Sequence, residues 1–172
     1  MKMIKNLLIL LFITLSTFCQ IQTDKTYTNP ESRQFDFWLG KWEVEWKDKE
    51  GITRTGSNNV IALFDSCVIE ENFNGQPGTE LVGKSFSVYD KKEKKWKQTW
   101  VDNSGAYLDF TGNYNDGKMI LSRRTIDNTG SALYQRMIYY NISGNSFDWN
   151  WEISHDNGKN WELRWKLHYV RK

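Results

Sequence analysis

The sequence predicts an all-β fold, an up-and-down antiparallel β-barrel of about ten strands with a short helical turn before the first strand. After Gly40, alternating or aromatic segments recur about every ten residues, and turn-forming residues separate them. No stretch beyond this glycine shows the sustained apolar period of a helix. An open meander of this length would expose two sheet edges, and closure into a barrel removes both.

Ten segments are expected to be strands, and residues that favour tight turns separate them. Breaks such as Asn74-Gly75, Asp116-Gly117 and Ser143-Gly144-Asn145 suit hairpins, because Asn, Asp and Gly tolerate positive φ. The expected strands are residues 41–48, 52–62, 66–74, 81–90, 95–102, 106–114, 118–126, 131–142, 146–154 and 161–171.

Residues 1–19 have the composition of a signal peptide, which predicts an exported protein, periplasmic or secreted. Lys2 and Lys5 give a positive start, and the apolar run that follows is too short for a membrane span. No integral membrane segment is therefore expected after processing. Acylation of Cys19 would instead anchor the chain to lipid, but the bulky Phe18 before it disfavours that alternative.

Residues 20–34 are polar and are expected to form a leader to one barrel domain at 35–172. Of the 23 basic residues, Lys2 and Lys5 belong to the signal segment, which leaves 21 against 21 acidic residues. This balance excludes the basic excess that nucleic-acid binding normally requires. Cys67 is the single cysteine after processing, so no internal disulfide is expected.

The segment before the first strand is rich in aromatic residues and reads FDFWLGKW at residues 35–42. Gly40 permits a tight turn, and Trp38 and Trp42 offer large apolar faces that can plug one end of a barrel. All nine tryptophans lie in the predicted domain, more than a small core usually needs. The surplus favours a barrel with an aromatic cavity.

This opening motif resembles that of the calycin superfamily of lipocalins and fatty-acid-binding proteins. More narrowly, it resembles a family of exported bacterial domains with an FDFWLGxW opening and no assigned activity. Further similar blocks are found at residues 83–86, 98–105 and 151–161, so that the resemblance covers about residues 33–172. It implies a lipocalin-like barrel and, by analogy, small-molecule binding. It also implies a basic residue over the first-strand tryptophan, with Arg171 facing Trp42, or Arg164 in its place.

The predicted ligand-binding residues come from three strands. Period-two alternation turns Trp100 and Asp102 toward the same side of their strand. Closing the barrel could place Arg136 near Asn150 or Glu152, opposite the first pair, and a few polar groups in an aromatic cavity are typical of a small-molecule site. Arg136 and Glu152 could equally form an ion pair on the outer face. Both faces of these strands carry aromatic residues, so the sequence leaves the two arrangements open.

The sequence therefore predicts an exported, cofactor-free barrel that binds a small apolar or aromatic molecule. It contains no recognisable catalytic or metal-binding motif, and its two histidines, His155 and His168, are not spaced as ligands. Two alternatives remain open. One is a carbohydrate-recognition module with exposed tryptophans, and the other is a lipocalin-like hydratase, isomerase or cyclase with Asp102 or Glu152 as acid or base.

Overall fold

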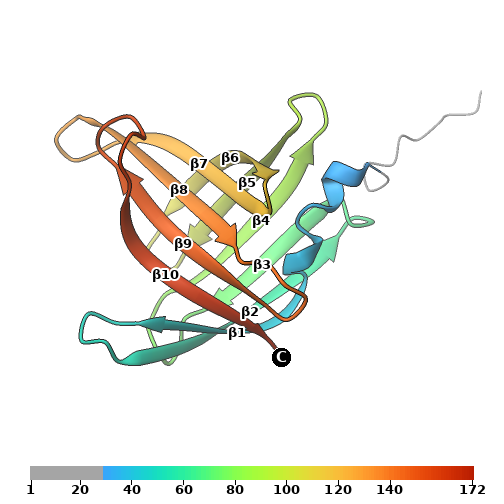
Figure 1. Cartoon of the computed structure of the whole chain (residues 1–172), viewed down its shortest axis with the longest axis horizontal. Helices are drawn as coiled ribbons and strands as arrows, with labels where there is room; N and C mark the ends of the chain where they lie inside the picture. The colour runs from blue at the N-terminus through green and yellow to red at the C-terminus, as the bar shows by residue number, and fades with distance from the viewer. Residues whose placement is uncertain (1–28) are drawn as a thin grey trace, which may run out of the picture.

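The computed structural model describes residues 29–172, which form a closed antiparallel β-barrel (Figure 1). The predicted fold is confirmed, with ten strands and a short helical segment before the first of them. The proposed signal peptide at residues 1–19 lies outside the described residues, as does most of the expected leader. No helix in the described part of the chain is long and apolar enough to cross a bilayer.

Every strand begins and ends within two residues of its predicted range. Hairpin chemistry explains this agreement, since Asp116, Asn141 and Asn157 adopt the positive φ that tight turns require. The strands are β1 (Gly40–Lys47), β2 (Thr53–Leu63), β3 (Val68–Asn74), β4 (Val82–Asp90), β5 (Lys95–Asp102), β6 (Tyr107–Asn115), β7 (Lys118–Ile126), β8 (Ala132–Tyr140), β9 (Ser146–Ser154) and β10 (Glu162–Arg171).

The order of strands around the barrel is their order in the chain, and β1 pairs with β10 to close the ring. Two pairings are short. Strands β1 and β10 are joined over four residue pairs, from Trp42 to Glu45 on β1, and β6 and β7 are joined only where Thr111–Asn115 meet Lys118–Ser122. The rest of β6 and β7 diverges toward the end of the barrel that carries the β5–β6 and β7–β8 turns.

Two short 3₁₀ helices, η2 (Pro30–Arg33) and η3 (Asp36–Trp38), precede β1 and lie at the right-hand end of the barrel in Figure 1, in blue. The Asn29 side chain caps η2 by accepting a hydrogen bond from the Glu31 amide at 3.1 Å. Ser32 is buried, and Gln34 accepts a hydrogen bond from the Trp96 indole at 3.2 Å. The described end of the expected leader therefore packs against the domain.

Side chains alternate between the barrel interior and the outer face, as a pleated strand requires. On β4 the residues that point inward are all buried, namely Gly83, Ser85, Ser87 and Tyr89. Their neighbours Lys84, Phe86 and Val88 are exposed on the outer face. The same alternation on the other strands fills the interior with aromatic side chains, but it fills the two ends of the barrel differently.

Candidate functional site

One end of the barrel is sealed by the opening motif. Arg171 lies over the Trp42 ring, with its guanidinium carbon 4.2 Å from the ring centroid. The guanidinium donates hydrogen bonds to the carbonyls of Leu39 at 2.8 Å, Phe37 at 3.1 Å and Gly144 at 2.9 Å. These contacts join the helical segment, the first strand and the last strand.

Gly40 and Trp38 complete this seal. Gly40 has a φ of +125°, and a Cβ atom there would lie 2.5 Å from an Arg171 nitrogen, so only glycine fits beneath the guanidinium. The Trp42 indole donates to the Trp38 carbonyl at 2.7 Å. Trp38, Trp42 and Phe35 are at most 1 % exposed. Trp42 is therefore part of the packed core at this end.

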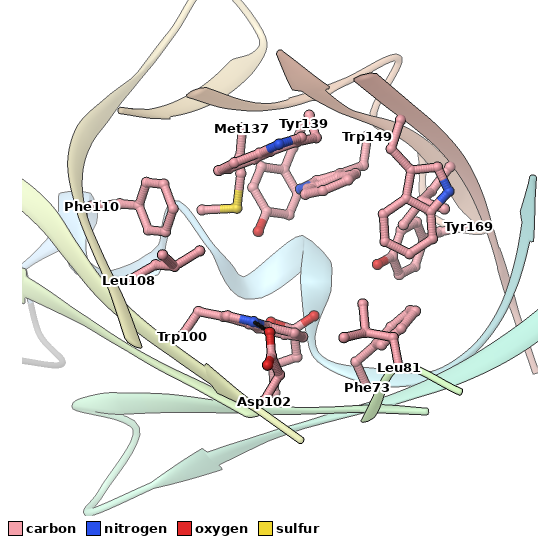
Figure 2. A pocket seen from close by; sticks show the side chains of 14 residues that line it. Phe73, Leu81, Trp100, Asp102, Leu108, Phe110, Met137, Tyr139, Trp149 and Tyr169 are labelled. Atoms are coloured by element: carbon pink, nitrogen blue, oxygen red, sulfur yellow. Dashed lines mark hydrogen bonds between the residues drawn. The ribbon is translucent and has the colours of Figure 1, made fainter. Parts of the chain in front are cut away.

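The other half of the interior contains a cavity of about 260 Å³, which Figure 2 shows with the helical segment behind it. Fourteen side chains line it, and most of them are aromatic rings or aliphatic groups. They are Glu71, Phe73, Leu81, Trp100, Asp102, Leu108, Phe110, Met137, Tyr139, Trp149, Trp151, Trp165, Leu167 and Tyr169. The volume lies just below the roughly 300–1,000 Å³ of pockets for drug-sized ligands, so it suits a smaller molecule.

Two of the predicted site residues, Trp100 and Asp102, line this cavity together. The Trp100 indole donates to Asp102 Oδ2 at 2.8 Å, and Asp102 Oδ1 accepts from the amide and hydroxyl of Ser104 at 2.9 and 2.6 Å. A Cβ atom at Gly83 would collide with the Trp100 ring, so this glycine lets the indole lie close to the wall. The ring is thus held in one orientation from two sides.

Asp102 remains ionised near neutral pH. Burial raises the pKa of its carboxyl group, but hydrogen bonds from Ser104, Trp100 and Ala106 favour the charged form and leave the pKa below its usual value. Since the same carboxylate ends β5 and organises the following turn, its position is fixed by backbone as well as by side-chain partners.

The other three predicted site residues, Arg136, Asn150 and Glu152, lie on the outer face of β8 and β9. Arg136 pairs directly with Glu152 across the two strands, at 2.7 Å from Nε and 2.6 Å from Nη2 to Oε2. Asn150 donates to the same carboxylate at 3.0 Å, and the guanidinium stacks on Trp161 with its carbon 3.9 Å from the ring centroid. None of the three lines the cavity. The structure shows the outer-face ion pair, the second arrangement that the sequence left open.

A further carboxylate, which the sequence reasoning missed, lies at the cavity. Glu71 of β3 is 6 % exposed and accepts hydrogen bonds from Asn58 Nδ2 at 2.7 Å and Ser85 Oγ at 2.6 Å. Burial raises the pKa of Glu71 to about 7, although these two hydrogen bonds oppose the change. The signal was present in the sequence, since Ile69 and Phe73 flank Glu71 on the inward face of the same strand.

Two tyrosines lie near Glu71 and point their hydroxyl groups into the cavity (Figure 2). Burial, with a smaller effect from the Glu71 carboxylate, raises the pKa of both Tyr139 and Tyr169 well above the usual value. Both therefore stay protonated and can donate hydrogen bonds. Asn58 connects Glu71 with Tyr169, since the Nδ2 atom that donates to the Glu71 carboxylate also lies 3.5 Å from the Tyr169 hydroxyl.

No basic side chain lines the cavity. Three basic residues lie at inward-facing positions of the described strands. Arg171 is held at the sealed end, and Arg54 is exposed at the start of β2, where it pairs with Asp48 at 2.8 Å. Arg123 lies where β6 and β7 diverge, with its guanidinium carbon 5.8 Å from the Phe110 centroid and a hydrogen bond of 3.3 Å to Gln135. Glu71 and Asp102 are therefore the charged groups that a bound molecule would meet.

The tryptophan side chains are all buried or partly buried. None of the nine tryptophans is among the exposed hydrophobic residues. Within residues 29–172, no group of three or more His, Cys, Asp or Glu side chains is placed to hold a metal ion.

Neither a scan of protein-family models nor a search of curated proteins finds a match to this chain.

Proposed function

We propose that this protein is an exported barrel that binds a small apolar or aromatic molecule inside its cavity. The observation that carries the proposal is the 260 Å³ cavity, of which eight of the fourteen lining side chains are aromatic. For scale, an apolar cavity of about 150 Å³ in another protein binds benzene. A molecule of one or two rings matches the space.

Apolar surface is the main source of affinity in such a site. Each square ångström of apolar ligand surface removed from water contributes about 25 cal/mol. The rings are pre-positioned, as Trp100 is held by Asp102 and by the approach to Gly83. Little side-chain ordering is then required on binding, which favours affinity.

Two features of the sequence support this proposal. Residues 1–19 have the composition of a signal peptide, and we propose export on that basis. The FDFWLGxW motif resembles the opening of calycins, whose barrels hold small molecules. An exported carrier or sensor of a small apolar compound combines both features with the cavity.

The two alternative functions have less support. Carbohydrate recognition on the outer face would require exposed tryptophan rings, and none of the nine is exposed. Acid–base catalysis across the cavity was suggested for Asp102 and Glu152, but Glu152 lies outside in the ion pair with Arg136. The lowered pKa of Asp102, set by its hydrogen bonds against the effect of burial, also makes it a poor proton donor near neutral pH.

Titration with 2-naphthol, a two-ring fluorescent aromatic probe that is uncharged near neutral pH, tests the proposal. Binding is expected to quench tryptophan emission and to saturate at one probe per chain. Leu108→Phe, which adds volume at the cavity wall, should weaken binding by about tenfold. Val101→Phe is the matched control, since Val101 is exposed on the outer face of the neighbouring strand. Absence of saturable binding, or equal weakening by both variants, would contradict an interior site.

A further inference from the structure

We propose that the molecule bound in this cavity carries a positive charge, as an amine or a quaternary ammonium group, and that this charge sits against Glu71 within the aromatic cage. The inference rests on the proposed function and makes it more specific. It is drawn from three features of the cavity: its charges, the arrangement of its rings and the position of Glu71.

The charges of the cavity all have one sign. Its two ionisable carboxyl groups, Glu71 and Asp102, face no lysine, arginine or histidine among the fourteen lining residues. In the described part of the chain, Glu71 forms no salt bridge, and its two hydrogen-bond partners are the neutral side chains of Asn58 and Ser85. A buried carboxylate is costly unless a cation pairs with it. A cationic ligand would supply the missing charge.

The rings beside Glu71 form the walls of a cage. Phe73 lies two residues along the same face of β3, with its ring centroid 6.2 Å from that of Trp100 and 6.0 Å from that of Trp165. Trp165 lies perpendicular to both Phe73 and Trp149, at 89° in each case. Rings that meet at right angles present faces from several directions to one central group. Such faces attract cations within about 6 Å, and aromatic cages of this type bind quaternary ammonium groups.

The protonation state of Glu71 fits this role. The titratable neighbours of Glu71 across the cavity include Tyr139 on β8 and Tyr169 on β10, which burial keeps neutral. Asp102 on β5 adds a second negative charge to the cavity wall. Burial raises the pKa of Glu71 to about 7, so a cation that binds near neutral pH should displace its proton. Without ligand, the protonated acid avoids the burial of an unpaired charge.

A pair of isosteric ligands separates charge from shape. Phenyltrimethylammonium and tert-butylbenzene differ in a charged nitrogen against a neutral carbon, and calorimetry or ligand-observed NMR measures both. At about pH 8, where Glu71 is ionised, the cation should bind at least about tenfold more tightly than the neutral isostere. At about pH 5 the preference should shrink, because Glu71 is then protonated.

Variants locate the group that selects the charge. Glu71→Gln should remove most of the preference for the cation while tert-butylbenzene still binds, since only the ring faces and Asp102 then attract the charge. Glu152→Gln is the matched control on the outer face and should keep the preference. A preference that persists in Glu71→Gln and disappears in Asp102→Asn would overturn the assignment to Glu71.

Proton release gives a second readout, which needs no variant. Phenyltrimethylammonium has no ionisable proton, so any proton released on binding comes from the protein. At about pH 7, where about half of the Glu71 carboxyl groups are protonated, calorimetry in buffers of different ionisation enthalpy should detect release of up to about half a proton per bound cation. Binding without release would overturn the role of Glu71.

The outcomes distinguish this inference from the proposed function. Equal binding of the two isosteres would leave the apolar cavity site intact and overturn the charge preference. Binding of 2-naphthol without binding of either isostere would also overturn the cation inference. Failure of all three molecules to bind would overturn the proposed function itself.

Discussion

The two ends of the barrel interior are built from the same kinds of side chain, yet one is packed and the other holds a cavity. At the sealed end, Phe35 contacts the rings of Trp96 at 4.9 Å and Tyr139 at 5.3 Å between centroids. At the open end, Trp149 and Trp165 meet at right angles from neighbouring strands, and among the lining side chains only that of Leu81 comes from outside the strands. The difference is the helical segment, which supplies rings to one end alone.

The comparison shows that aromatic content does not by itself distinguish a core from a binding site. A ring at the sealed end has partners on its face and its edge, and its removal leaves a void. A ring at the open end already borders a cavity on one side. Stability should therefore depend on the sealed end, and ligand affinity on the open end.

The largest expected effect is on the sealed end. Trp42→Ala should lower the free energy of unfolding by about 3–5 kcal/mol, because Trp42 is fully buried, bonded to the Trp38 carbonyl and covered by Arg171. Trp151→Ala at the cavity should cost less than half as much. Urea denaturation measures both values. Equal losses would show that the two ends are packed alike.

The next effect depends on pH and sharpens the contrast at Glu71. Because burial raises the folded-state pKa of Glu71 from 4.5 to about 7, the folded state binds more protons than the unfolded state between these values. The stabilisation from the protonated Glu71 side chain is fully present below about pH 4.5 and is lost as the pH rises through about 7. The free energy of unfolding should decrease by about 3 kcal/mol over this range. Glu71→Gln should remove this decrease in denaturation curves measured across the range.

The neighbouring Glu70 provides a matched control with the opposite sign. It lies on the outer face, where a hydrogen bond from Lys84 at 2.8 Å lowers the pKa of its carboxyl group. Its stabilisation is therefore present above the unfolded-state pKa and is lost as the pH falls. If Glu70→Gln and Glu71→Gln changed the pH dependence in the same direction, the assignment of Glu71 to the interior would be wrong.

A smaller loss is expected from Arg171, without an effect on the cavity. Arg171→Met should cost about 2 kcal/mol, since the carbonyls of Leu39, Phe37 and Gly144 lose a charged donor. Arg171→Lys keeps the charge but cannot replace the planar fork, so it should recover only part of the loss. Probe affinity should be unchanged in both variants. A large loss of affinity would show that the two ends are coupled.

The smallest effect is expected on the outer face. Arg136→Met removes the ion pair with Glu152 and the stacking on Trp161, which together should contribute about 1 kcal/mol. Binding of the fluorescent probe should not change, because Arg136 does not line the cavity. A tenfold loss of probe affinity, by contrast, would place a ligand on this face.

The sequence specified the fold closely because turns and alternation are local properties. Three strands, Lys95–Asp102, Lys118–Ile126 and Ser146–Ser154, agree with the expected ranges residue for residue. Trp100 and Asp102 were also identified, since both lie on the inward face of β5 with Trp96 and Gln98.

The sequence does not determine which side chains of β8 and β9 point into the barrel and which point outward. Tyr134, Ile138 and Tyr140 give the outer face of β8 as much apolar character as the inner face has from Met137 and Tyr139. The β8–β9 register pairs Met137 with Trp151 and Arg136 with Glu152 alike, so only the curvature of the closed barrel, which turns Met137 toward the cavity, decides between the two faces. Glu71 was missed for a related reason. Its alternation with Ile69 and Phe73 favours the inward direction, but Val68 gives the face of Glu70 some apolar character as well.

The seal made by Arg171 and Trp42 also sets an order of events in folding. Nine of the ten strand pairings join neighbours in the chain, so each can form as a local hairpin. The tenth joins β1 to β10, and the Arg171–Leu39 hydrogen bond there spans 132 residues. The chain entropy lost in so distant a contact makes closure the slow step. The sealed end should therefore form last, and the wall of the cavity is complete only after that final pairing.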